Sequence, residues 1–537
     1  MESDRTAGSD RVDRISSGNV VGQTAEAGAV TGEDHQRSES PGTAASPAAS
    51  SPTLCDLFAR TLARRPDALA LSDPPNKARV TGQPPLKLTY AQADRAIASL
   101  TTQLMNAGLP PGSVVAMQMA NTIEYPLVLL AAWRAGLTVA LLPQLWRRAE
   151  LADALGRVSA RAIICASRIE IVDHAELAMS AAADTFSIRQ VFGIGGNLPD
   201  GMTPLDLHAS NLTGSTPPQP PSVDARKAAI VSFDVMPESL LAVPRSHVNL
   251  IAGGLGITME SALPQGARIL SCAIPSSFAG LVTSIVAWLL TGGSLSLHHP
   301  FDLQTLEKQI RDDGCNALIV PAHLALRLSG TGAIDARPAL RHVIGLWRTP
   351  ECAGSSNDWL GRQAAFTDVY LFGEAGLFAA QRLENGSAAP IAESLYKAAR
   401  SPVEIHLTPH GTLALRGAMT VPAAYRAPRA DDDLNPAANY VDTGYAARRD
   451  KISGAIYITA PPAGLMTVGG YRYRTQDLER WAARLAPGAT LTALPDQLNG
   501  HRLAGRAEDN ARAREALAEL GLGPLMTEAF RERGPAR

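Results

Sequence analysis

The sequence predicts an α/β fold, with a large N-terminal domain of mostly parallel sheets covered by helices, a β-rich subdomain and a small α/β C-terminal domain. Two observations support this prediction. From residue 89 to residue 321, short apolar segments alternate with longer segments whose apolar residues recur at helical spacing. From about residue 400, short strands and turns replace this pattern. Strands alternating with helices of this length form βαβ units, whose parallel sheets are buried on both faces.

The predicted elements follow in order. Ordered structure begins near Thr53 with a helix, because Leu54, Phe58 and Leu62 have helical spacing. Thr89 is the expected N-cap of the next helix and Gly108 its stop. Strands are then expected at 113–120, 138–143, 160–166, 227–233, 267–274, 294–299 and 316–321, and helices at 124–137, 147–158, 247–258, 280–290 and 302–314.

Residues 1–51 are rich in Ser, Gly, Ala and acidic residues, and we expect them to be disordered because they bury too little apolar surface. The predicted domains are then an N-terminal domain at 52–459, a hinge-like linker at 460–464 and a truncated C-terminal domain at 465–537. Residues 197–224, which are rich in Pro and Gly, are predicted to form a loop within the first domain.

Composition excludes several classes of partner. The chain has 537 residues, 45% of them hydrophobic and 19% charged, and a net charge of −2 with no basic block. It therefore offers no attraction to nucleic acid or to an anionic membrane. The five cysteines have no CxxC spacing and no His partner at metal-ligand spacing, so we expect free thiols, no metal site and a cytoplasmic protein.

The apolar stretch 269–293 is long enough to suggest a membrane span. Pro275, Ser276 and Ser277 interrupt it, however. We therefore predict a buried strand, a loop and a buried helix, and no transmembrane segment. No signal peptide is expected, because the first residues lack an apolar core.

Five motifs occur in an order typical of one protein family. The first, "LTYAQADRAIASLTTQLMNAGLPPGSVVAMQMANTIEYPLVLLAAWRAGLTVALLP", is followed by "LRHVIGLW", "DVYLFGEAGLF", "NYVDTGYAARRD" and "GGYRYRTQDLERW". Over residues 52 to about 510 the chain thereby resembles the adenylate-forming superfamily of AMP-binding enzymes, which includes acyl-CoA synthetases and aryl-CoA ligases. The resemblance implies activation of a carboxylic acid by ATP and Mg²⁺, and often transfer to coenzyme A.

The resemblance also implies a phosphate-binding loop, in which backbone amides, Thr hydroxyls and a Lys cradle ATP. The positions are counted back from Ser246 and His247. Val235 and Glu238 replace the family's two glycines, and Met236 and Pro237 replace its two threonines. Leu241 replaces the lysine, and Ala242 replaces the final glycine. Asp234 and Glu238 add negative charge where phosphate would lie. We therefore expect no ATP binding in the family's manner, and we expect His247 to pack against or cap the next helix.

The segment "FGEAG" corresponds to the family's adenine wall and Mg²⁺ ligand. Phe372 and Gly373 keep the family's aromatic residue and glycine, whereas Ala375 and Gly376 stand at its Thr and Glu positions. Glu374 would reach the Glu position only after a shift in register, so no metal ligand is assigned.

Four further positions differ from the family. Trp347 and Arg348 stand near small residues of the adenine slot, and Tyr445 replaces the Asp that holds the ribose hydroxyls. Tyr cannot offer the pair of acceptors that a carboxylate provides. Phe278 stands where many acyl-CoA synthetases have a His, so it is the one residue assigned to the acyl pocket.

The hinge and the catalytic lysine of the family are also altered. Residues 460–463 read Ala-Pro-Pro-Ala, and the prolines stiffen the segment about which the C-terminal domain should rotate. The last lysine is Lys451, so this chain has none in the C-terminal domain; Arg531, Arg533 and Arg537 could replace only its charge. No catalytic residue is assigned.

These departures lead to three hypotheses. The first is a degenerate homologue that has lost ATP-dependent activation and needs no cofactor, and that binds an acyl or aryl compound or a partner protein. The second is an active acid–CoA ligase with a relocated site, which would use ATP, Mg²⁺ and coenzyme A. The third is a non-catalytic scaffold, whose acyl cavity would be filled by large side chains.

Overall fold

The computed structural model describes residues 51–208, 219–355, 359–392, 403–421, 440–485, 487–496 and 500–531. The segment predicted to be disordered, 1–51, lies outside these residues except for Ser51. The loop predicted at 197–224 is described in part, and it contains one very short strand at Thr203–Pro204, which the sequence did not predict.

The first sheet has seven strands, which are parallel except for one edge hairpin. In spatial order they are β11 (Leu240–Ser246), β10 (Ala228–Val235), β4 (Thr138–Leu141), β3 (Val114–Gln118), β5 (Ala162–Ala166), β8 (Gln190–Ile194) and β9 (Thr203–Pro204). A separate small hairpin pairs β6 (Arg168–Ile169) with β7 (Val172–Asp173).

Both faces of this sheet are buried. Successive residues of β3 alternate between two hydrophobic cores, with Val115 and Met117 in one and Val114 and Ala116 in the other. The first core contains residues of α3 (Tyr90–Asn106) and α4 (Glu124–Arg134), and the second contains residues of α5 (Arg148–Val158) and α6 (His174–Ala183). This explains why the strands read as continuous apolar runs, since neither face meets solvent.

The second sheet has eight strands, antiparallel only at its two edges. Their order is β17 (Leu377–Gln381), β16 (Ala365–Leu371), β15 (His342–Trp347), β14 (Ala317–Pro321), β12 (Arg268–Ser271), β13 (Ser294–Leu297), β1 (Leu69–Ser72) and β2 (Lys87–Thr89). The helices that precede or connect these strands along the chain are α1 (Leu54–Arg64), α2 (Lys77–Thr81), α7 (His247–Glu260), α10 (Leu303–Asp312), α11 (Ala322–Gly330) and the 3-10 helix η2 (Pro350–Ser355).

The N-terminal end of α3 was predicted correctly. The Thr89 hydroxyl accepts the amide of Gln92 at 3.2 Å, and the Gln92 side chain accepts the amide of Thr89 at 2.8 Å. These two bonds satisfy amide groups that have no partner within the helix.

The apolar stretch 269–293 is a strand, a loop and a buried helix, as predicted. After β12, the helix runs through α8 (Phe278–Leu281), the π-helical turn η1 (Val282–Val286) and α9 (Ala287–Thr291). Trp288 of α9 packs against Phe58 and Tyr90, with ring centroids 6.1 and 5.9 Å away. Among the helices of the described residues, none has both the length and the apolar character that crossing a bilayer requires.

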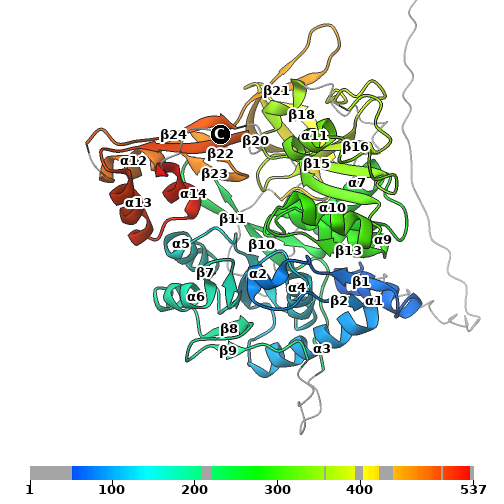
Figure 1. Cartoon of the computed structure of the whole chain (residues 1–537), viewed down its shortest axis with the longest axis vertical. Helices are drawn as coiled ribbons and strands as arrows, with labels where there is room; N and C mark the ends of the chain where they lie inside the picture. Colours follow the sequence, from blue (N-terminus) through cyan, green and yellow to red (C-terminus); the bar gives the residue numbers. More distant parts are fainter. Residues whose placement is uncertain are drawn as a thin grey trace, which may run out of the picture. The chain divides into compact units, whose positions relative to one another are not determined.

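The remaining strands form small antiparallel sheets (Figure 1). One contains β18 (Val403–Leu407), β19 (Thr412–Gly417), β20 (Val441–Arg449) and β21 (Ile456–Ala460), and two hairpins pair β22 (Leu465–Val468) with β23 (Tyr471–Arg474) and β24 (Thr490–Asp496) with β25 (Gly500–Arg506). The last helices are α12 (Thr475–Leu485), α13 (Asn510–Glu519), α14 (Pro524–Thr527) and the 3-10 helix η3 (Glu528–Phe530). The β-rich texture after residue 400 is therefore confirmed.

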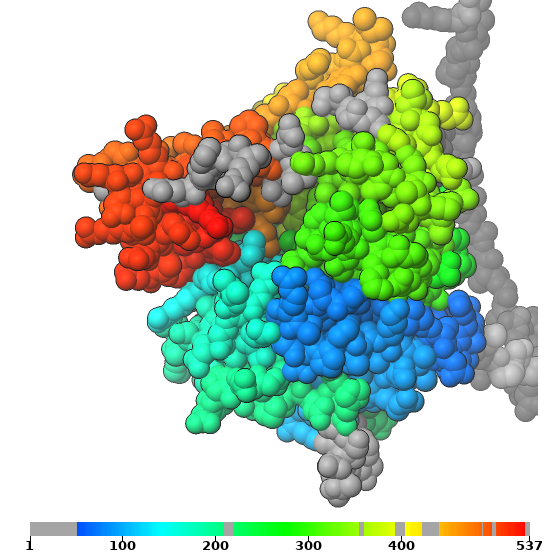
Figure 2. Space-filling model, in the orientation of Figure 1, coloured from blue at the N-terminus to red at the C-terminus, as the bar shows by residue number. Residues whose placement is uncertain are grey.

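The elements from β22 onward have a hydrophobic core of their own, which includes Val468, Leu478, Leu517 and Phe530. They contact the first sheet near α5, where the amide of Ala149 donates to the carbonyl of Gly521 at 3.4 Å. Figure 2 shows these orange and red residues against the cyan part of the chain that contains α5.

Candidate functional site

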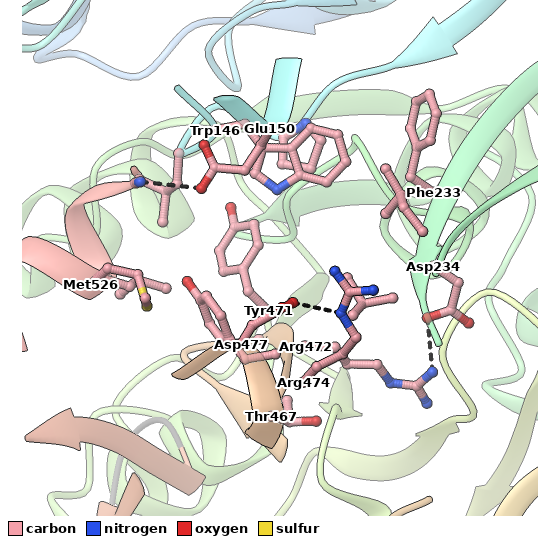
Figure 3. Close-up of a pocket in the computed structure, with 18 of the residues that line it drawn as sticks. Trp146, Glu150, Phe233, Asp234, Thr467, Tyr471, Arg472, Arg474, Asp477 and Met526 are labelled. Atoms are coloured by element: carbon pink, nitrogen blue, oxygen red, sulfur yellow. Dashed lines mark hydrogen bonds and ion pairs between the residues drawn. The ribbon is translucent and has the colours of Figure 1, made fainter. Parts of the chain in front are cut away.

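A cavity of about 300 Å³ lies where the first sheet, the second sheet and the C-terminal elements meet. The first sheet contributes the β10–β11 hairpin and α5, and the second contributes the turn after β16. The C-terminal elements contribute β23, α12 and residues 522–526. Figure 3 shows Trp146 and Glu150 across the cavity from Arg472, Arg474 and Asp477.

The segment that corresponds to the phosphate loop is a tight hairpin. Val235 of β10 pairs with Leu240 of β11, and the amide of Met236 donates to the carbonyl of Ser239 at 2.9 Å. Leu241 lies in β11 directly opposite Asp234, and Glu238 is exposed at the turn. Of the positions assigned to the family's loop, only Val235 lines the cavity.

Asp234, beside Val235, forms an ion pair with Arg472 of β23. The Arg472 Nη1 atom lies 2.8 Å from Asp234 Oδ1, and the two side chains are 9% and 7% exposed respectively. The other guanidinium nitrogen, Nη2, donates to the Tyr445 hydroxyl at 2.9 Å. Burial would lower the pKa of Arg472, but Asp234 and Tyr445 together raise it. Arg472 therefore links the hairpin to Tyr445, the residue that the sequence predicted at the family's ribose-binding position.

Gly373 is adjacent to this ion pair and has no room for a side chain. Its φ is +58°, and a Cβ atom there would overlap Arg472 and the carboxylate of Asp234. Phe372 stacks edge-on against Tyr445 with ring centroids 5.4 Å apart. Ala375 and Gly376 form the tight turn back to β17, in which the amide of Phe372 donates to the Gly376 carbonyl at 3.1 Å. Gly373 lines the cavity, whereas Phe372, Ala375, Gly376 and Tyr445 do not.

Glu374 is engaged by a second buried cation. Its Oε2 atom lies 3.7 Å from Arg245 Nη1 and accepts the amide of Phe278 at 3.0 Å. Its own amide donates to Asp234 Oδ2 at 2.7 Å. Burial raises the pKa of Glu374 and lowers that of Arg245 to about 10. Among the described residues, no group of three or more His, Cys, Asp or Glu could hold a metal ion.

Phe278 is fully buried and does not line the cavity. The Arg245 guanidinium lies 3.8 Å from the centroid of its ring. A Cβ atom added to Gly253 would overlap the same ring. Phe278 thus packs beneath the Glu374–Arg245 pair, and the cavity is bounded here by its neighbours Ser277 and Ala279.

Trp347 and Arg348 are adjacent in sequence but have different environments. The Trp347 indole donates to Asp368 Oδ1 at 2.6 Å in the core. Arg348 lines the cavity and donates to the carbonyl of Gly470 at 2.8 Å and to the Ser277 hydroxyl at 3.5 Å. Gly470 has a φ of +87°, and a Cβ atom there would overlap the Arg348 side chain.

The remaining walls of the cavity are largely apolar or aromatic. Phe233 of β10 lies against Trp146 with ring centroids 5.6 Å apart, and Tyr471, Trp481 and Met526 also line the cavity. Sequence reasoning did not single out Arg472 or these aromatic residues. The alternating "YRYR" of β23 was the available signal, and all four of its residues line the cavity.

The cysteines and His247 have structural environments. Burial raises the pKa of the Cys55 and Cys165 thiols to about 12, so neither forms a thiolate near neutral pH. His247 begins α7, packs its ring against Trp133 and accepts the amide of Leu54 at 3.4 Å. Burial lowers its pKa to about 4.

Comparison with known proteins finds likeness over part of the chain. Residues 58–233 match the model of the AMP-binding enzyme family. An alignment over 123 residues is 29% identical to a salicylyl-CoA synthase / salicylate adenylyltransferase of a Streptomyces species. It spans 23% of this chain and 22% of that protein. These two matches support the adenylate-forming superfamily over the part of the chain that they cover.

Several solved structures have the same fold as this chain. The amide bond synthetase McbA from Marinactinospora thermotolerans superposes with a TM-score of 0.65 at 16% identity, covering 89% of this chain and 94% of McbA. MbtA from Mycobacterium smegmatis superposes with a TM-score of 0.61 at 18% identity, covering 88% of this chain and 89% of MbtA. NpsA-ThdA, an artificially fused adenylation–PCP di-domain from Klebsiella oxytoca, superposes with a TM-score of 0.63 at 17% identity. The match covers 88% of this chain and 92% of that protein. At these identities the likeness concerns the fold alone.

Proposed function

We propose that this protein is an adenylate-forming homologue that binds an acyl or aryl small molecule and no longer activates it with ATP. The observation that supports this most is the bridge from Asp234 through Arg472 to Tyr445. By resemblance to the superfamily, the bridge joins a position that would contact phosphate to one that would contact ribose. Because Asp234 and Arg472 already neutralise one another, they add little electrostatic attraction for a nucleotide.

Charge and energetics favour the same proposal. A triphosphate near the hairpin would face the carboxylates of Asp234 and Glu374, both of which line the cavity. The family's loop contributes several charge-assisted hydrogen bonds, each worth about 1.5–3 kcal/mol. Losing three or four forfeits roughly 5–10 kcal/mol, whereas micromolar binding corresponds to only about 8 kcal/mol in total.

A second candidate is an active acid–CoA ligase with a relocated site, using ATP, Mg²⁺ and coenzyme A. Its support is the local likeness to a salicylyl-CoA synthase, which spans about a fifth of that protein. A scaffold with no small ligand is less well supported, because a cavity of about 300 Å³ remains open between the sheets and the C-terminal elements. Binding of a partner protein is the alternative use of the same fold.

Calorimetry with ATP and Mg²⁺ on the full chain tests the proposal. We expect no heat of binding up to millimolar ATP, and no pyrophosphate release when salicylate, benzoate or hexanoate is added. A salicylate adenylyltransferase assayed beside it shows that the acids and buffer support the reaction. Micromolar ATP binding or acid-dependent pyrophosphate release by this protein would refute the proposal and favour the ligase.

A further inference from the structure

The balance of charge in the cavity indicates what kind of ligand it takes. Each carboxylate that lines the cavity is already engaged by groups of the protein. The pairs are Asp153 with Arg157 at 2.9 Å, Asp234 with Arg472 at 2.8 Å, Glu374 with Arg245 at 3.7 Å, Asp477 with Arg474 and Arg480 at 2.5 and 2.9 Å, and Glu150 with the amides of Arg147 and Gly523 at 2.8 and 3.2 Å. The cavity therefore has no spare negative charge for a cationic ligand.

Among the described residues, Arg348 is the cavity-lining arginine that forms no ion pair. Arg472, Arg474 and Arg480 each pair with a carboxylate. Within the described part of the chain, Arg348 has no carboxylate partner, and it donates only to the neutral oxygens of Gly470 and Ser277. Burial lowers the pKa of Arg348, the charges of Tyr471 and Glu374 oppose this in part, and a guanidinium remains charged in proteins even so. A charge in such a place is costly unless it is paired.

The surroundings of Arg348 suit the body of an amphipathic molecule. The same cavity is walled by Trp146, Phe233 and Ile274, so an apolar group would find aromatic and aliphatic contacts. Tyr471 also lines it, and in the described structure its buried hydroxyl has no hydrogen-bond partner. A few polar groups converging on a mostly apolar cavity are the usual form of a small-molecule site.

We propose that Arg348 binds the anionic group of a small organic acid whose aromatic or aliphatic body lies against Trp146 and Phe233. This inference rests on the proposed function and names the residue that anchors the ligand. The Tyr471 hydroxyl supplies a second donor to the same anion. Arg348 holds its position because Gly470 leaves room for its side chain and accepts one of its N–H groups.

Binding of matched acid and amide probes to the full chain, without ATP, tests the inference. The probes are 1-naphthoate with 1-naphthamide and benzoate with benzamide, followed by calorimetry and by tryptophan fluorescence, since Trp146 and Trp481 line the cavity. We expect each acid to bind at least about tenfold more tightly than its amide, as a charge-assisted hydrogen bond requires. Equal affinity for acid and amide, or no binding of either acid at millimolar concentration, would overturn the inference.

Two variants assign the effect to Arg348. Arg348→Gln should weaken acid binding at least about tenfold and leave amide binding unchanged, so that the preference for the acid disappears. Arg157→Gln is the matched control, because it removes an arginine near the cavity that does not line it. Preference for the acid that survives in Arg348→Gln, or that falls equally in Arg157→Gln, would contradict the assignment. Thermal unfolding of each variant checks folding, and Arg348→Lys should retain part of the preference if the charge is what matters.

Failure of this inference can be told from failure of the proposed function. Acid binding through Arg348 together with acid-dependent pyrophosphate release would refute the proposed loss of activation but keep the anchor. Absence of both acid binding and pyrophosphate release would refute the anchor alone.

Discussion

At the scale of single residues, the Asp234–Arg472 pair combines burial with charge. Both side chains are more than nine-tenths buried, with 7% and 9% exposure. Removing one partner of such a pair leaves the other as an unpaired buried charge, whereas replacing both by apolar groups can be neutral. Single substitutions in the pair should therefore lower the stability of the fold, whereas replacing both residues by apolar ones should change it little.

Asp234→Asn should lower the free energy of unfolding by about 3 kcal/mol, because Arg472 would keep its charge without a counter-ion. The double variant Asp234→Asn with Arg472→Met should recover much of this loss. Urea unfolding measures both. Asp153→Asn is the control on an exposed pair and should cost less than about 1 kcal/mol. Equal losses at the two sites would contradict the assignment of a buried pair.

His247 makes stability depend on pH. Its pKa is about 4 in the folded chain against a usual value of 6.5, because burial disfavours the charged ring. Between these values the unfolded chain binds the proton and the folded chain does not, so stability falls as pH is lowered from about 6.5 to 4. The full effect is roughly 3 kcal/mol.

His247→Gln should remove this dependence. Urea unfolding of wild type and variant at several pH values between 4 and 7 gives the difference that belongs to this residue. The destabilisation caused by the substitution should be largest near pH 7 and should shrink towards pH 4. A difference that stays constant across the range would show that His247 keeps its ordinary titration in the folded state.

At the scale of elements, the start of α7 explains why the sequence keeps "SHVNL" directly after a loop that differs from the family's pattern. Ser246 closes β11 and caps α7: its hydroxyl accepts the amide of Asn249 at 3.2 Å, and the Asn249 side chain accepts the amide of Ser246 at 2.9 Å. Asn249 also donates to the carbonyl of Ala418 at 2.7 Å, which connects the helix start to a distant turn. These contacts require no nucleotide.

Ser246→Ala should lower the free energy of unfolding by about 1 kcal/mol, because it removes the capping acceptor. Ser246→Gly is the matched comparison and should cost only a few tenths of a kcal/mol, since glycine tolerates the cap conformation. Chemical unfolding distinguishes them. If both variants cost the same, the contribution of Ser246 lies in packing and not in capping.

At the scale of the whole molecule, the C-terminal elements have their own core, and several polar contacts join them to the sheets. These include the Arg348–Gly470 and Gly523–Glu150 hydrogen bonds and the Arg472–Asp234 pair. We propose that these elements form the small domain predicted from residue 465. An attachment of this kind should open without unfolding the sheets.

The double variant Asp234→Asn with Glu150→Ala should therefore accelerate amide hydrogen exchange throughout 465–531 and leave exchange in α3 and α4 near wild type. Mass spectrometry of peptides after exchange resolves the two regions. Asp153→Asn again serves as the control. Acceleration spread evenly over the whole chain would mean that the variant lowers global stability and that the C-terminal elements do not open separately.

Much of the architecture could be predicted from local patterns. The continuous apolar runs of β3 and β5 indicated strands buried on both faces, and Thr89 with Gln92 indicated a capped helix start. These features depend on residues within one element, so their spacing in the sequence reports them directly. The order of motifs was enough to recognise the family and its fold.

The chemistry of the cavity could not be predicted in that way, because its partners are far apart in the chain. Arg472 and Asp234 are 238 positions apart, and Arg348 and Gly470 are 122 apart. From the sequence, Asp234 was interpreted as a negative charge where phosphate would lie, and Arg348 as a bulky residue near the small positions of the adenine slot. Only folding brings β23 beside the hairpin, where Arg472 neutralises Asp234, while Arg348 faces the cavity with no ion pair among the described residues. Local order follows from hydrophobic spacing along the chain, whereas the balance of charge in a cavity depends on which distant strands meet there.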